Sequence, residues 1–247
     1  GRRRNKGKIY ETIGRAEQLQ KIIIVREDEY KLIEKISASG KPLQNLLAED
    51  GCWRGEELGK KTDLIKPQRD AFKKLLFGED IGRYKVKDSG KYINPLDVKK
   101  GNKYYQKKIM VRQLGDTINA ALDRDGLYVT LQSTYNLVPT INSEYLLGVF
   151  NSRLINWYYV KLFKEKELFP RVLLENLKVL PVIEPNSSDQ KKLSEKISKL
   201  VEKLVDAHKK PTESESQKIE EEIDSLVFEL YGITDAERKI VEKALEN

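Results

Sequence analysis

Apolar and polar residues alternate along the chain with two different periods, and these predict a mixture of strands and helices. Short β-branched or alternating runs predict strands over residues 21–25, 81–86 and 91–95. Helical spacing predicts a helix that begins at Asp28, with Leu32, Ile33 and Ile36 on its apolar face, and a second helix over 67–78. Residues 43–47 are expected to be an extended apolar segment, followed by a turn at 49–51.

The central part of the chain predicts an antiparallel sheet and a long helix. Residues 109–116 and 118–138 are expected to pair as antiparallel strands around a turn at Asp123–Gly126, after a loop over 97–108. A helix is predicted over 144–163, and 171–185 are expected to form a short helix and a strand ended by prolines. The residues that form the apolar face of the long helix are expected to be core: Leu146, Leu147, Phe150, Leu154, Trp157 and Tyr158.

The last part of the chain predicts three helices. The first two, over 189–209 and 217–231, carry apolar residues at alternating steps of four and three, which indicates that they pack against each other as an antiparallel pair. A third helix follows within 231–245, with Thr234 as N-cap and Glu237 completing a capping box. Because each apolar stripe is narrow, these helices are expected to pack on the rest of the protein or on another chain.

These elements predict a mixed α/β (α+β) fold with a twisted, mostly antiparallel sheet and packed helices, followed by a C-terminal helical hairpin. Three regions are expected. Residues 1–39 form a basic arm, a strand and a helix, 40–186 form the main domain, and 187–247 form a helical spacer or docking region.

Composition bounds the class of protein. A mean hydropathy of −0.60 with 34% charged residues describes a soluble protein, and no apolar run approaches the ~20 residues that span a bilayer. A signal peptide is not visible. The single cysteine, Cys52, excludes an intrachain disulfide and indicates a cytoplasmic protein. Because Met110 is the only methionine, the chain is expected to be a piece of a longer protein.

Charge is distributed unevenly. Residues 1–40 hold 10 basic and 6 acidic side chains, residues 41–186 hold 25 and 18, and residues 187–247 hold 11 and 15, giving net charges of +4, +7 and −4. A basic body with an acidic tail indicates that the body meets a polyanion, while the tail has another role. The run of basic residues at 1–8 is expected to be a loosely held arm.

The sequence contains no convincing catalytic signature. Structural zinc needs about four Cys or His ligands, but the chain has only Cys52 and His208, and a Ser–His–Asp triad would rest on His208 alone. The acids at 123–125 and 165–167 are explained by solvation, and the glycines near Lys60 have the wrong spacing for a phosphate loop. An adenine methyltransferase would need a Pro-Pro pair that is absent here. We therefore expect no catalysis, no metal and no cofactor in this chain.

DNA binding is better supported. Lysines in loops supply the mobile positive charge that phosphates attract. Arginine and glutamine on rigid elements can read guanine and adenine in the major groove, and tyrosines can pack on sugars or bases. The candidate phosphate-binding residues are Lys60, Lys61, Lys99, Lys100, Lys103, Lys107 and Lys108, the candidate base-reading residues are Arg112, Gln113, Arg124 and Gln132, and the candidate stacking residues are Tyr104 and Tyr105.

Several short motifs occur in an order that resembles the TaqI-like C-terminal specificity domain of Type IIG restriction–modification enzymes. The sequence GEDIGRY at 78–84 is followed by KIMVRQLGD at 108–116, DRDG at 123–126 and Tyr135–Asn136. YLLGVFNS at 145–152 and LKVLP at 177–181 complete the series. Many of the matching positions look structural, among them Gly78, Ile81, Leu146 and Gly148, so they do not identify base contacts.

The resemblance implies a target-recognition domain for double-stranded DNA, with a helical spacer similar to those of Type I specificity subunits. It also implies a parent that is an N6-adenine DNA methyltransferase, usually fused to an endonuclease, which uses S-adenosylmethionine and Mg²⁺. The expected partners are double-stranded DNA and the catalytic module of the parent, with homodimerisation through the C-terminal helices as a further expectation. Interaction with a membrane is not expected.

Two other hypotheses remain open from the sequence. The chain could be a helical dimerisation or protein-interaction module whose basic surface is incidental, which weak salt dependence of DNA binding would favour. It could also be a nuclease in its own right, which would require a cluster of acids that the sequence does not reveal.

Overall fold

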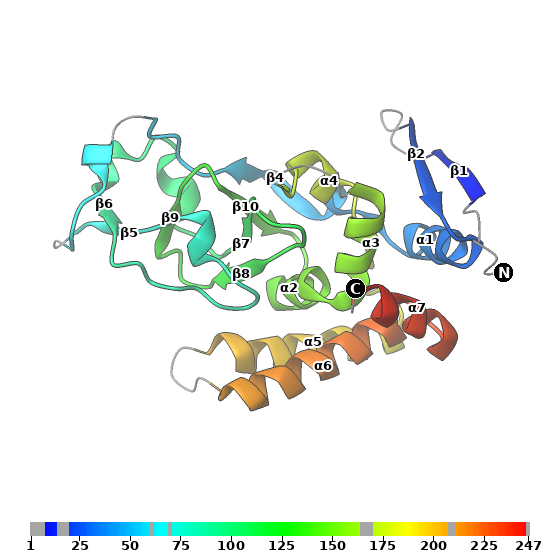
Figure 1. Ribbon diagram of the computed structural model, residues 1–247. Coiled ribbons are helices and arrows are strands. Elements are labelled where there is room, and N and C mark those ends of the chain that lie inside the picture. The colour runs from blue at the N-terminus through cyan, green and yellow to red at the C-terminus, as the bar shows by residue number, and fades with distance from the viewer. Residues whose placement is uncertain are drawn as a thin grey trace.

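The computed structural model describes residues 8–13, 20–59, 62–68, 71–163, 170–206 and 211–245. A central antiparallel sheet separates a smaller sheet, at one end of the molecule, from a layer of helices (Figure 1). The mixed α/β fold with a C-terminal helical hairpin is therefore confirmed.

The N-terminal part forms a hairpin and a helix. Strands β1 (Lys8–Ile13) and β2 (Gln20–Val25) pair antiparallel, so the predicted strand at 21–25 is confirmed. Helix α1 (Glu27–Ser39) follows, and it buries Leu32, Ile33 and Ile36 as expected.

We call residues 41–186 the body, and two short strands join its beginning and its end. Strand β3 (Lys41–Pro42) pairs antiparallel with β11 (Pro181–Val182), and the backbone N–H of Leu43 donates to the carbonyl of Leu180 at 2.9 Å. Gly40 makes this approach possible, because a Cβ there would lie 2.6 Å from the backbone of Val182. The chain thus enters and leaves the body at one place.

The central sheet has the strand order β4 (Leu47–Arg54), β10 (Thr134–Pro139), β7 (Lys108–Arg112), β8 (Ala120–Asp123), and every pair in it is antiparallel. The predicted antiparallel pairing between 109–116 and 118–138 is confirmed. The predicted hairpin around Asp123–Gly126 is wrong, however, because β9 (Tyr128–Thr130) leaves for a second sheet, where it pairs in parallel with β5 (Lys73–Leu76).

Further predictions for residues 43–86 differ from the structure in part. The helix predicted over 67–78 is β5, which pairs with both β9 and β6 (Tyr92–Ile93). The strand predicted over 81–86 is a turn closed by a single bridge between Ile81 and Val86. Residues 43–46 form a 3₁₀ turn instead of an extended segment. The turn expected at 49–51 is present as a bulge within β4, where Asp50 has a φ of +53° and the register with β10 shifts.

The long helix predicted over 144–163 is two helices, α2 (Ser143–Asn151) and α3 (Arg153–Phe163), which meet at Ser152. The extended conformation of Ser152 (ψ 151°) ends α2. Side chains satisfy the backbone groups that this break frees, since Asn156 Nδ2 donates to the carbonyls of Phe150 and Ser152, each at 3.0 Å. The predicted apolar face is buried in the core, as expected.

The same break gives Asn151 a structural role at the edge of the sheet. Its side-chain amide accepts from the N–H of Ala120 at 3.0 Å and donates to the carbonyl of Ala120 at 2.9 Å. Since β8 is an edge strand, this amide occupies backbone groups that another strand could otherwise pair with.

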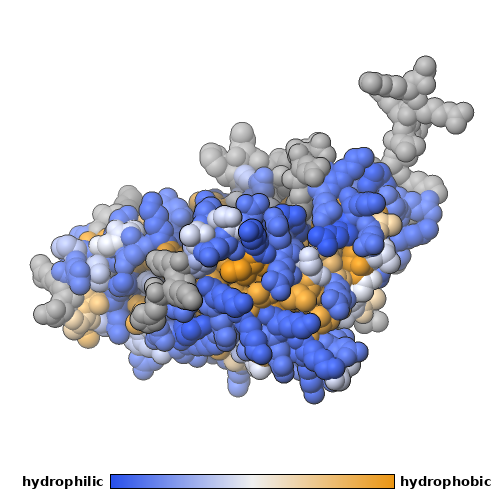
Figure 2. Space-filling view, turned by 90° about the horizontal axis from the view of Figure 1, so that it is seen from below, coloured by the Kyte–Doolittle hydropathy of each residue, from blue (hydrophilic) through white to orange (hydrophobic). Residues whose placement is uncertain are grey.

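The C-terminal helices confirm the predicted hairpin and capped third helix. After α4 (Leu174–Lys178) and β11, α5 (Ser188–Val205) packs against α6 (Glu213–Leu230), and both contact α2. Helix α7 (Asp235–Leu245) follows, with the N–H of Glu237 donating to Thr234 Oγ1 at 3.3 Å. Helices α5 and α6 lie below the body in Figure 1, and the surface seen from that side is mostly hydrophilic with an apolar strip near its centre (Figure 2).

We call α5, α6 and α7 the helical arm. Gly148 in α2 lets the arm approach closely, because a Cβ at this position would lie 2.5 Å from Ile197 Cγ2 and 3.2 Å from Val201 Cγ2. One cluster of buried apolar residues runs from α1 through the central sheet into the arm, while a smaller one lies beneath the β5–β6–β9 sheet. Within the described residues, no helix is long and apolar enough to cross a membrane.

Candidate nucleic-acid interface

Two of the predicted base-reading residues lie together where β7 ends and β9 turns into β10. The backbone N–H of Gln113 donates to the carbonyl of Ser133 at 2.9 Å, which places Gln113 beside the turn that carries Gln132. Gln132 is exposed, whereas Gln113 is 8% exposed and its Nε2 donates to the Tyr135 hydroxyl at 3.0 Å. Burial raises the pKa of Tyr135 above its usual value, so this hydroxyl stays protonated.

Arg54, which the sequence reasoning missed, is oriented by these same residues. It lies at the end of β4, where its Nε donates to the carbonyl of Gln132 at 2.6 Å and a terminal nitrogen lies 3.4 Å from Gln113 Oε1. The other terminal nitrogen lies 3.4 Å from Glu57 Oε1, and the side chain is 44% exposed. A guanidinium held in this way is preorganised for a bidentate contact. The alternation of β4, with Trp53 buried, could have identified Arg54 as a residue on the opposite face from Trp53, at the exposed end of the strand.

Arg112 and Gln113 do not act as a pair. Successive side chains of a strand point to opposite faces, and Gln113 points with Val111 and Ile109 toward the helix-covered face. Arg112 is opposite Thr134 in the register and therefore faces the other side. Its Nε is buried, and among the described residues it has no hydrogen-bond partner. The sequence placed the two residues in one role, whereas the fold separates them.

The lysine segment, residues 97–108, is held at its first half by a buried carboxylate. Glu56 is fully buried and accepts from the backbone N–H of Lys100 at 2.9 Å and of Lys99 at 3.2 Å. The ammonium group of Lys100 donates to the carbonyl of Gly55 at 3.1 Å. Lys99, Lys103 and Lys107 are exposed, so three of the predicted phosphate-binding lysines face solvent.

Two predicted contact residues in this segment are corrected, because both are fully buried. Tyr104 packs edge-on against Trp53, with ring centroids 5.8 Å apart, and its hydroxyl lies 3.4 Å from the carbonyl of Thr130. Lys108 forms an ion pair with Asp123. Neither Tyr104 nor Lys108 is available to a nucleic acid in this fold. The neighbouring Tyr105 is half-buried, with the ammonium of Lys73 4.7 Å from the centre of its ring.

Arg124 lies apart from the other base-reading candidates. It is 47% exposed and lies 3.6 Å from Glu144, a carboxylate that is 5% exposed near the start of α2. The same carboxylate accepts from Lys107 at 2.7 and 2.8 Å. Lys107 and Arg124 thus converge on one acidic group. Lys60, Lys61 and His208 lie outside the described residues.

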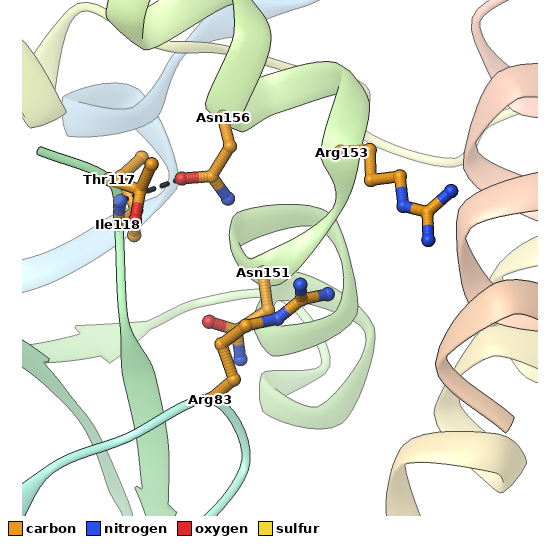
Figure 3. Close-up of a pocket in the computed structure, with 6 residues that line it drawn as sticks. All are labelled: Arg83, Thr117, Ile118, Asn151, Arg153 and Asn156. Carbon is orange, nitrogen blue, oxygen red and sulfur yellow. Dashed lines mark hydrogen bonds between the residues drawn. The ribbon is translucent and has the colours of Figure 1, made fainter. Parts of the chain in front are cut away.

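A pocket of about 200 Å³ lies where the body meets the arm, and it is lined by Arg83, Thr117, Ile118, Asn151, Arg153 and Asn156 (Figure 3). Asn156 Oδ1 accepts from the N–H of Ile118 at 2.7 Å, and Arg153 points away from that bond. Both arginines pair with carboxylates of α6, since Arg83 lies 3.1 Å from Glu220 and Arg153 lies 3.2 Å from Asp224. The pocket is therefore part of the joint between body and arm.

Asp224 is the more deeply buried of the two acids that pair with these arginines. Its side chain is 4% exposed, and burial raises its pKa to about 6, against the lowering effects of the Arg153 N–H and of the two arginines. In the described part of the chain, no group of three or more His, Cys, Asp or Glu side chains could hold a metal ion.

A comparison with models of known protein families matches the family that the short sequence motifs indicate. Residues 73–182 match the family described as the TaqI-like C-terminal specificity domain. Among curated proteins, none matches the chain.

Two solved structures are similar. They are the Type IIL restriction–modification enzyme MmeI in complex with DNA (14% identity, TM-score 0.46) and the S subunit of a Type I restriction–modification system from M. genitalium (19% identity, TM-score 0.43). The matches cover 79% and 66% of this chain, but only 32% and 39% of those chains. The family resemblance that the motifs indicate is confirmed for residues 73–182, which match the TaqI-like C-terminal specificity domain.

Proposed function

We propose that this chain is the sequence-specific, double-stranded DNA recognition region of a restriction–modification enzyme. The observation that carries the proposal beyond the family match is the preorganised cluster at the end of the sheet. Arg54 is exposed and held by the carbonyl of Gln132 and the amide of Gln113, which is an arrangement suited to reading a base edge.

Phosphate contacts would come from the exposed lysines of the lysine segment. Lys99 and Lys103 project from a loop whose backbone is fixed from within by Glu56, so they can meet a phosphate backbone at little cost in ordering the loop. Such contacts set register and affinity, whereas the Arg54 cluster would supply specificity.

The rest of the proposal concerns the parent protein. We propose that the recognition region positions a methyltransferase and an endonuclease located elsewhere in the parent, a cytoplasmic Type IIG enzyme. Methylation of adenine would use S-adenosylmethionine and cleavage would use Mg²⁺, both bound by the catalytic module. The arm would be the docking element for that module.

Homodimerisation through the arm is a further part of the proposal. Lys192, Lys196, Lys199 and Lys203 are exposed and fall on one side of α5, while Glu222 and Glu229 are exposed and seven residues apart on α6. A twofold arrangement could place the lysines of one copy against the glutamates of the other. Sedimentation equilibrium at low and high salt tests this. A dimer that weakens with salt is expected, and a monomer at all concentrations would contradict it.

The experiment that tests the recognition role is selection from a randomised duplex pool at two salt concentrations. Enrichment of one short sequence is expected, and Arg54→Ala should abolish the enrichment while retaining salt-dependent binding. Lys31→Ala on α1 is the matched control, because it removes one exposed positive charge from an element that belongs neither to the cluster nor to the proposed dimer contacts.

Other outcomes would contradict the proposal. Retention without enrichment would mean phosphate contacts alone, and no retention even at low salt would favour the protein-interaction hypothesis. Metal-dependent cleavage by this chain alone would revive the nuclease hypothesis.

A further inference from the structure

The turn between β8 and β9 packs directly against the lysine segment. Gly126 has a φ of +65°, and a Cβ on it would lie 2.5 Å from both the Gln106 nitrogen and the Tyr105 carbonyl carbon. Backbone thus packs on backbone, with no room for a side chain. The turn that carries Arg124 and the loop that carries the lysines cannot move independently at this contact.

A buried ion pair joins the same two segments from beneath. The ammonium of Lys108 donates to a carboxylate oxygen of Asp123 and to the carbonyl of Tyr104 at 2.7 Å. Asp123 in turn accepts from the backbone N–H groups of Leu127 at 2.9 Å and Tyr128 at 3.0 Å. Lys108 therefore ties the end of the lysine segment to the turn, while Asp123 fixes the shape of the turn itself.

The other end of the lysine segment is fixed by Glu56, and the exposed side is bridged by Glu144. Glu56 accepts from two consecutive backbone N–H groups at 99 and 100, and Glu144 contacts both Lys107 and Arg124. Buried charges of this kind are costly unless fully hydrogen-bonded, so they maintain one geometry of their surroundings.

We infer that the lysine segment and the Asp123–Gly126 turn form one preorganised unit, in which Lys108 is a positioning residue for phosphate contacts made by its neighbours. The role in phosphate contacts rests on the proposed DNA-binding function, whereas the existence of the rigid unit does not. The sequence predicts Lys108 as a phosphate ligand, but its side chain is buried beneath the loop. It holds the loop so that Lys99, Lys103 and Arg124 present a fixed pattern of charge.

A comparison of Gly126→Ala with Gly90→Ala tests, without DNA, whether the lysine segment and the turn form one unit. Both glycines have similar φ angles, +65° and +67°, but a Cβ on Gly90 would meet nothing within 4 Å. Both variants carry the same conformational strain, and only Gly126→Ala pushes on residues 105–106. Amide hydrogen exchange should accelerate at least about tenfold in both 99–108 and 123–128 for Gly126→Ala, but only around residue 90 in the control. Acceleration confined to 123–128 would overturn the inference.

Glu56→Gln provides a second variant if Gly126→Ala does not fold. The amide can accept only one of the two N–H bonds, so exchange at Lys99 and Lys100 should accelerate and the change should extend to the turn. An effect limited to 99–100 would contradict the existence of one unit.

Binding to a mixed-sequence duplex over a range of salt concentrations tests whether the unit positions the phosphate contacts. Gly126→Ala should bind more weakly, and its slope of log K against log salt should fall by about 0.9 for each phosphate that it no longer neutralises. Gly90→Ala should match the unmodified protein. Equal slopes in all three proteins would overturn the positioning role. If the unmodified protein binds no duplex, the proposed function fails, and hydrogen exchange still decides whether the unit exists.

Discussion

The body has two kinds of basic surface, and they differ in the acids that they meet. Toward the arm, Arg83 and Arg153 lie 3.1 Å and 3.2 Å from Glu220 and Asp224, whose side chains are only 23% and 4% exposed. Among the residues proposed to contact DNA, Lys103 lies 3.5 Å from Asp50, which is 85% exposed. Arg54 has a similarly exposed partner in Glu57, at 66%.

This difference shows why net charge does not locate an interface. A pair with a hydrated, exposed acid contributes about 0–1 kcal/mol and is easily exchanged for a phosphate. A pair with a buried acid is costly to break, because the acid would be left uncompensated. The arginines that face the arm are therefore structural, whereas Arg54 and Lys103 remain available.

The largest expected effect comes from forcing the arm away from the body. Gly148→Val should reduce the free energy of unfolding by about 2–3 kcal/mol, because the new side chain overlaps Ile197 and Val201 of α5. Urea denaturation measures this. Gly82→Val is the control, since a Cβ at Gly82 comes no closer than 3.8 Å to its nearest neighbour. Equal stabilities for the two variants would mean that the arm is not closely docked at Gly148.

At the proposed base-reading cluster, Arg54→Ala should weaken binding to the selected sequence by about 2 kcal/mol, or roughly thirtyfold. Binding to unrelated duplexes should change much less. Fluorescence anisotropy with the selected and a scrambled duplex measures both affinities. Arg83→Ala removes the same charge from the arm-facing surface and should leave the ratio of the two affinities unchanged. A change in that ratio with Arg83→Ala would mean that the arginines facing the helical arm also affect DNA specificity, and that the two basic surfaces do not differ in role.

The pH dependence of stability should reveal the buried acid of the arm. Burial raises the pKa of Asp224 to about 6 in the folded protein, above its usual value, so the folded state binds the proton more tightly than the unfolded state. Its contribution to stability is therefore present at low pH, declines between about pH 4 and 6, and is lost above that range.

Asp224→Asn should abolish this decline, which we expect to be on the order of 1–2 kcal/mol. Thermal unfolding of both proteins at closely spaced pH values measures the difference between them, which cancels the opposite contributions of groups such as Glu29 and Asp88, whose pKa values are lowered. An unchanged difference across this range would mean that Asp224 does not titrate as its burial implies.

The smallest effect is expected at Glu144. Glu144→Gln should loosen the bridge between Lys107 and Arg124, so binding to mixed-sequence duplexes at low salt should be up to severalfold weaker than for its control variant. Glu79→Gln, at an exposed acid, is the control for the change in net charge. Tighter binding by Glu144→Gln than by the control would mean that Glu144 competes with phosphates instead of positioning Lys107 and Arg124.

The parts of the fold that the sequence predicted correctly are those held by local periodicity and capping. Helix α1 and the arm follow from apolar stripes, and the Thr234–Glu237 box follows from its spacing. The helix predicted over 67–78 failed because Lys73–Leu76 gains its hydrogen bonds from β6 and β9, which are distant in the sequence. The long helix failed because Asn151 bonds to the edge of the sheet, which no local pattern reveals.

Prediction of the candidate site was limited for a similar reason. A lysine-rich run indicates positive charge but not direction, so Lys108 could not be distinguished from Lys107, although one is fully buried and the other exposed. The cluster of Gln113, Gln132 and Arg54 depends on the pairing of β10 with β4 and β7, and only the assembled sheet brings these residues together. The roles of the remaining predicted contact residues stay predictions.

The pairing of β3 with β11 has a consequence for how the protein can vary. These two short strands close the chain on itself, so the segment from residue 43 to 180 is a single excursion that begins and ends at one place, with its helix α2 packed on the helical arm. The entropy of closing such an excursion grows only with the logarithm of its length, and doubling the length costs about 0.6 kcal/mol. Changes of length in the exposed loops of this segment should therefore cost little stability, as long as α2 and its contact with the helical arm are kept.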